Sequence, residues 1–162
     1  MSATTMEAHG GQAQERFMRR ISVYVPVALV VYAGAQLLTS AAESDPEIRE
    51  LWLEDLTAQS VIGLLAVGVA LFIGRWAARR DRRARVRGVI GLAACAVVVA
   101  PLVWWSAAPA VLAASAITLG DVTGVNDRER GSGPARTLTL LAGLAAAVAF
   151  TIVTVSVIVK AS

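Results

Sequence analysis

Long uncharged, apolar runs alternate with short charged blocks along this chain. Four runs contain no Asp, Glu, Lys, Arg or His, and they cover residues 21–42, 56–74, 88–120 and 137–159. A transmembrane helix needs about 20 apolar residues to cross a hydrocarbon core about 30 Å thick. Three of the runs have that length. The pattern therefore predicts an all-α integral membrane protein, a helical bundle of four to five transmembrane helices.

The run over residues 88–120 is too long for one crossing, because a helix of that length would extend about 50 Å. Its middle holds two prolines and the adjacent Trp104 and Trp105. One interpretation is a hairpin of two short crossings, over about 88–104 and 108–120, with the tryptophans at the outer turn. The other is a single crossing followed by an apolar helix lying at the membrane interface, where tryptophan is favoured.

The charged blocks differ in sign, and this difference predicts an orientation. Seven arginines fall between residues 75 and 87, and only Asp81 opposes them, whereas residues 43–55 hold six acids and one arginine. Loops on the cytoplasmic side of a membrane carry the excess of Lys and Arg. We therefore expect the N-terminus and the 75–87 loop to be cytoplasmic and the 43–55 loop to be extracellular, in a protein of the cell membrane.

The same rule helps to choose between the interpretations of the long run. With five crossings, 13 of the 15 Lys and Arg residues lie inside, whereas four crossings place 11 inside. The charge distribution slightly favours the hairpin. It requires two short crossings, however, so both four and five passes stay open, and with them the side of the C-terminus.

The ends divide the chain into a tail and one domain. Residues 1–15 are polar and lack apolar periodicity, so we expect a disordered cytoplasmic tail. Residues 16–162 form a single membrane domain. The stretch from Arg16 to Ala42 resembles a cleaved signal peptide, but its apolar run exceeds the usual ~7–15 residues.

The acidic loop has helical features of its own. Ser44 and Asp45 are good helix N-caps, and Pro46 suits a first turn. Apolar residues, Trp52 among them, then recur at helical spacing. We expect a short amphipathic helix at the outer interface, acting as a connector rather than as a docking surface for a basic partner.

Clustered arginines beside a span favour contact with anionic lipid headgroups, since each contributes about 1 kcal/mol near such a surface. These candidate lipid-contact residues are Arg75, Arg79, Arg80, Arg82, Arg83, Arg85 and Arg87. Nucleic acid is a poor partner for them, because Trp76 is the only aromatic residue among them and its expected place is the membrane edge. The sequence pI near 9.7 then reflects topology.

Reactive side chains are scarce where a membrane enzyme or pump would need them. Ionisable groups inside spans usually mark proton relays and ion pathways, and these runs contain none. The only histidine is His9, and the only cysteine is Cys95 within the third run. The sequence therefore predicts no enzymatic activity, no cofactor and no metal site.

Two further patterns concern helix packing. Gln36 and Gln59 lie toward the outer ends of the first two runs, and we expect them to hydrogen-bond to each other. Small residues spaced four apart let helix backbones approach closely. The resulting small-residue ladders pack the bundle internally or associate with another chain, and they consist of Ala66, Ala70 and Gly74 in one helix and Gly143 and Ala147 in another.

The stretch PLVWWSAAPAVLAASAITLG, over residues 101–120, is followed by a polar, Gly-rich loop and another apolar run. This C-terminal half resembles small multi-pass actinobacterial membrane proteins of unknown function, as does the use of fourteen arginines against one lysine. The resemblance implies a helical membrane fold and carries no activity.

Two functional hypotheses follow from these patterns. The first is an accessory or scaffold subunit that acts through helix–helix and lipid contacts, with a second copy or another membrane subunit as its partner. The alternative is a small oligomeric transporter or channel for a neutral or lipidic substrate, built around the Gln, Ser and Thr positions of the spans.

Overall fold

The computed structural model describes residues 3–42, 46–127 and 132–161. Within these ranges the chain forms helices and no strands, which confirms the all-α fold. The helices are α1 (Ala3–Ala42), α2 (Pro46–Ala78), α3 (Arg82–Val99), α4 (Ala108–Thr123) and α5 (Gly133–Ala161).

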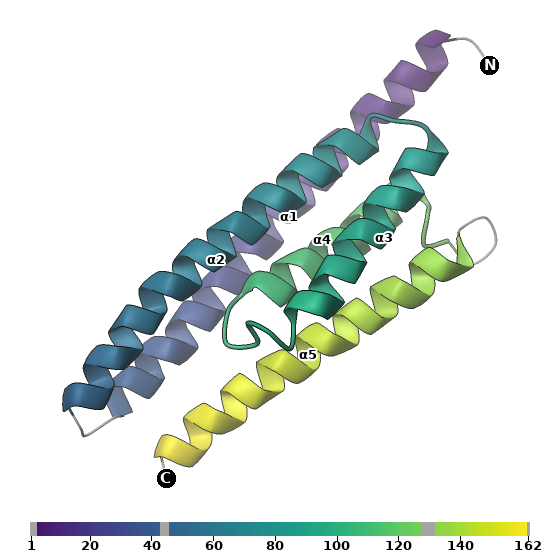
Figure 1. The fold of residues 1–162 in the computed structure, drawn as a ribbon. Helices are drawn as coiled ribbons and strands as arrows, with labels where there is room; N and C mark the ends of the chain where they lie inside the picture. Colours follow the sequence, from purple (N-terminus) through teal and green to yellow (C-terminus); the bar gives the residue numbers. More distant parts are fainter. Residues whose placement is uncertain (1–2, 43–45, 128–131, 162) are drawn as a thin grey trace.

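The helices run alternately up and down (Figure 1). The start of α1, the α2–α3 connection and the α4–α5 connection lie toward one end of the bundle. The α3–α4 connection and the C-terminus lie toward the other. We call the first end the basic end, because it carries the arginines between residues 75 and 87.

Three helices are long and apolar enough to cross a membrane, over Gly11–Leu38, Glu54–Ala78 and Gly133–Val155. They overlap three of the four predicted runs. Only 22% of the most apolar window of each span is buried inside the chain. Large apolar side chains such as Val30 and Phe72 are instead 70% and 74% exposed. Such extended apolar surface is unfavourable in water and is expected in lipid, so the fold is that of a multi-pass membrane protein.

The shortest helix, α4, is the central one. It packs against α1, α2, α3 and α5, and ten of its 16 residues are buried. It runs back alongside α3 (Figure 1), which agrees with the hairpin interpretation. α3 ends at Val99, before the predicted boundary near 104, and Pro101 follows, which has no N–H to donate to a continuing helix.

The first residues of the chain correct one prediction. We expected residues 1–15 to be a disordered tail, yet α1 begins at Ala3. Ala13 and Phe17, one helical turn apart, are 7% and 0% exposed. Ala13 is small and Phe17 is the single aromatic residue nearby, so the sequence of this segment shows no apolar periodicity. At about 1.5 Å per residue, α1 is longer than a membrane is thick.

The acidic connector also differs from its prediction. α2 begins at Pro46 and continues without interruption to Ala78, so residues 46–53 are the first turns of the helix that holds the candidate span Glu54–Ala78 rather than a separate helix. Helical propensity continues through this segment, and no residue in it breaks the helix. The predicted caps, Ser44 and Asp45, lie outside the described residues, as does the side chain of Trp52.

The turn between α2 and α3 is tight, and it sets the position of the arginines. Asp81 caps α3 by accepting a hydrogen bond from the Ala84 backbone N–H at 3.1 Å. A Cβ atom on Gly88 would lie 2.5 Å from the Cβ of Ala77. The two helices therefore approach closely just after the turn.

Candidate functional site

The seven candidate arginines gather at one end of the bundle, on the last turn of α2, the following turn and the first two turns of α3. Six of them are exposed, whereas Arg85 is half-buried. Arg85 Nη2 donates to the Ala78 carbonyl at 3.4 Å. This arginine therefore bridges the α2–α3 turn, and the other six face outward.

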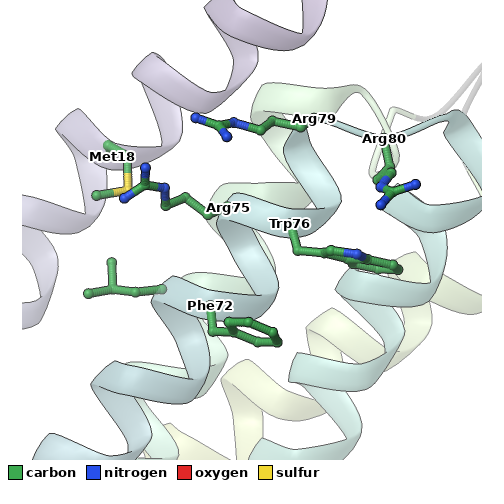
Figure 2. A pocket seen from close by; sticks show the side chains of 7 residues that line it. Met18, Phe72, Arg75, Trp76, Arg79 and Arg80 are labelled. Atoms are coloured by element: carbon green, nitrogen blue, oxygen red, sulfur yellow. The ribbon is translucent and has the colours of Figure 1, made fainter.

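Three of the exposed arginines border a groove of about 570 Å³ beside α2 (Figure 2). Its floor is apolar and combines one side chain of α1 with three of α2. The lining residues are Met18, Leu71, Phe72, Arg75, Trp76, Arg79 and Arg80. The groove thus joins an apolar surface to a cationic rim near the end of the candidate span Glu54–Ala78.

Two of the rim arginines are held in place by neighbours. Arg79 Nε donates a hydrogen bond to Gln14 Oε1 of α1, which fixes it between the two helices. The guanidinium carbon of Arg80 lies 5.9 Å from the centroid of the Trp76 ring, a cation–π contact. Both guanidinium groups keep further N–H donors, since arginine has five.

A second basic hollow of about 620 Å³ lies on α3. Its lining combines Arg82, Arg83 and Arg87 with Val86 and with Ser132 from the α4–α5 connection. Val86 is its one apolar side chain, so this hollow lacks the apolar floor of the groove on α2. The two hollows differ in what they can hold, although both are cationic.

Sequence reasoning identified the rim of the groove and missed its floor. Leu71 and Phe72 belong to the apolar run over residues 56–74, which assigned them no further role, and Met18 lies before the first run. Phe72 and Trp76 are spaced four apart on α2, so they share one helix face, and Arg80 follows in the turn after the helix. That spacing was the available signal, but the partner surface on α1 required the fold.

The two small-residue ladders have different places in the fold. Ala66, Ala70 and Gly74 are buried, and a Cβ atom on Gly74 would overlap the ring of Phe17. This ladder packs the bundle internally. On α5, Gly143 is half-buried and Ala147 is exposed, so the second ladder faces outward in part.

The expected Gln36–Gln59 hydrogen bond is wrong. Both side chains are buried, but Gln36 Oε1 and Gln59 Nε2 each lack a hydrogen-bond partner. The nearby hydroxyl of Tyr32 is unpartnered too. Both glutamines are thus buried on neighbouring helices without forming the expected hydrogen bond.

Metal-binding side chains do not cluster in the part of the chain that the structure describes: it contains no group of three or more His, Cys, Asp or Glu residues suited to hold an ion. Cys95 is exposed on α3, facing the surroundings of the bundle.

Comparisons with protein-family models, with curated proteins and with solved structures found no match to this chain. The resemblance of the C-terminal half to small actinobacterial membrane proteins therefore stays a prediction. What the chain does has to be argued from its own surfaces, and the arginine-rimmed groove is the most distinctive of them.

Proposed function

We propose that this chain is a non-enzymatic, multi-pass protein of the cell membrane that binds anionic phospholipid at its basic end and acts as an accessory or scaffold subunit. The N-terminus and the 75–87 segment lie on the cytoplasmic side, and the 43–55 segment lies outside. The observation that carries the proposal is the groove on α2, where an arginine rim stands directly over an apolar floor.

The groove matches the two parts of a phospholipid. A guanidinium group binds phosphate through paired N–H donors, and Arg75, Arg79 and Arg80 present three such groups. Below them, Phe72 is 74% exposed and offers an apolar surface to an acyl chain. Trp76 lies between the two levels, which is the interfacial position that tryptophan favours.

An accessory role rests on the outward face of α5. Ala147 is exposed, and Leu144 and Val148 beside it are 62% and 51% exposed. A small residue among larger apolar ones lets a partner helix approach closely. The partner is a second copy of this chain or another membrane subunit.

Replacing Arg75, Arg79 and Arg80 together with glutamine will weaken the binding of phosphatidylglycerol by roughly 100-fold, because each arginine contributes about 1 kcal/mol. The measurement is a titration of that lipid into the full chain in phosphatidylcholine nanodiscs. The matched control replaces Arg82, Arg83 and Arg87, which removes the same charge from the hollow without an apolar floor. Equal losses of lipid affinity in the two variants would show that positive charge alone accounts for the binding. Such a result would contradict a specific lipid site in the groove.

Ala147→Leu will reduce association with the partner, because the larger side chain keeps a second helix from approaching α5. The measurement is the amount of partner or second copy retained when the tagged chain is purified from its native membrane in mild detergent. Leu144→Val, one turn away, keeps the apolar character of the same face and serves as the control. Recovery of the wild-type chain alone would contradict the accessory role.

The alternative function is a small transporter for a neutral substrate. One observation favours it, namely the buried and unpartnered polar atoms of Tyr32, Gln36 and Gln59. A homo-oligomer is compatible with both functions, so the oligomeric state alone does not separate them. Flux of a neutral solute into vesicles would then be the measurement to make.

A further inference from the structure

A separate cavity of about 220 Å³ lies between α1 and α2 at the start of α4. Leu29 and Leu56 form apolar walls, and Tyr32, Gln59 and Ser60 contribute the polar groups. Gln59 is 16 residues before Arg75, which places it about 24 Å along α2 from the basic groove. The cavity and the groove are therefore different sites.

Two polar side chains that line the cavity have no partner within the protein. Tyr32 is 3% exposed and Gln59 is 6% exposed, yet Tyr32 Oη and Gln59 Nε2 make no hydrogen bond. A buried polar group without a partner costs about 1–3 kcal/mol, and such groups are rare in native proteins. Two of them at one cavity call for a partner from outside the chain.

The third polar group of the cavity is already satisfied. Ser60 Oγ donates to the Leu56 carbonyl at 2.8 Å, so this hydroxyl offers no free donor. Among the side chains that line the cavity, the unmet capacity to donate a hydrogen bond is thus confined to the tyrosine hydroxyl and the glutamine amide. Both can donate, and the carboxamide and hydroxyl can accept as well.

The start of α4 adds a directional preference. Ala107 lines the cavity and is the N-cap of α4, and it makes no side-chain capping bond. The N-terminal end of a helix carries a partial positive charge. A ligand oxygen is therefore favoured at this wall. The residues lining the cavity include no Asp, Glu, Lys, Arg or His that would pair with a charged ligand.

We propose that this cavity binds a small uncharged molecule that carries a hydroxyl or carbonyl oxygen on a compact apolar body. The oxygen accepts hydrogen bonds from Tyr32 and Gln59, and the apolar body lies against Leu29 and Leu56. The proposal does not depend on lipid binding at the basic end.

The test uses 4-fluorobenzyl alcohol as the probe and 4-fluorotoluene as the same ring without a hydroxyl. Fluorine NMR follows each probe with the full chain in phosphatidylcholine nanodiscs, against empty nanodiscs. The alcohol will bind saturably to the wild-type chain and about tenfold more weakly to Tyr32→Phe and to Gln59→Leu, since each variant removes one hydrogen bond. Fluorotoluene will show no saturable binding.

Two controls separate binding from folding. Ser60→Ala removes a hydroxyl from the same cavity that is already bonded to Leu56, so it will leave alcohol binding unchanged. Tyr32→Phe retains the ring that packs edge-on against Phe150 of α5, with centroids 5.8 Å apart. Both test variants will melt no lower than the wild type, because each removes an unsatisfied polar group.

Several results would overturn the proposal. An absence of saturable alcohol binding to the wild type would mean that water alone fills the cavity. Equal weakening by Ser60→Ala would show that the effect is not specific to the unpartnered groups. Lower melting temperatures for both test variants would show that the two polar groups have partners within the protein.

Discussion

Replacing Gly74 with alanine will lower the melting temperature of the bundle, whereas the same replacement at Gly68 will not. A Cβ atom on Gly74 would overlap the ring of Phe17, which is fully buried. Forcing extra atoms into a packed core costs about 1–3 kcal/mol. The measurement is thermal unfolding of both variants in the same detergent.

Gly68 is a closely matched control for Gly74. It lies on the same helix, and no atom lies within 4 Å of the position its Cβ would take. Both replacements gain the same helix propensity, about 1 kcal/mol in favour of alanine. The difference between their melting temperatures therefore measures the effect of the overlap with Phe17. Combining Gly74→Ala with Phe17→Leu will recover part of the loss. Equal melting temperatures for the two alanine variants would contradict the close α1–α2 packing.

A cysteine at position 127 will be protected from a membrane-impermeant maleimide in intact cells, whereas one at position 102 will react. This expectation follows from the interpretation with five crossings, in which the α4–α5 connection lies on the same side of the membrane as the basic end. Figure 1 shows the α4–α5 connection and the α2–α3 turn toward one end of the bundle. Leu102 lies in the opposite connection and is 64% exposed. Both cysteines are introduced singly into a Cys95→Ala background.

Lysed cells provide the control for this labelling. The cysteine at position 127 will react fully once the membrane is open, which shows that only the bilayer protected it. Reaction of both positions in intact cells would mean four crossings, with α4 failing to return through the membrane. Such a result would also move three arginines to the outside, against the charge bias that orients membrane helices.

The lengths of the uncharged runs predicted the long apolar helices well, because the thickness of the hydrocarbon core sets the length that a crossing helix needs. The three helices that are long and apolar enough to cross a membrane overlap three of the uncharged runs. The connection between α3 and α4 covers residues 100–107 and contains the tryptophan pair. The tryptophans contact each other edge-on, with centroids 6.0 Å apart. These features are local in sequence, so no knowledge of tertiary packing was needed.

Other features depended on contacts between distant residues. Nothing in the run of alanines around Ala113 and Ala116 indicated that α4 would be the central helix, since a helix wrapped by other helices and one facing lipid are both apolar. The same limit applies to the groove, whose floor pairs Met18 of α1 with Phe72 of α2. It also explains the error at Gln36 and Gln59, because depth in a membrane does not define the angle between side chains.

The central position of α4 has a consequence for how the chain is assembled. During synthesis, α1, α2 and α3 emerge before α4, and α5 emerges last. The first three helices therefore cannot form their final packing until the fourth arrives between them, and one side of α4 stays open until α5 is made. Ser115 and Thr118 on α4 are both buried in the finished bundle. A chain interrupted before α5 would leave the α5-facing side of α4 uncovered.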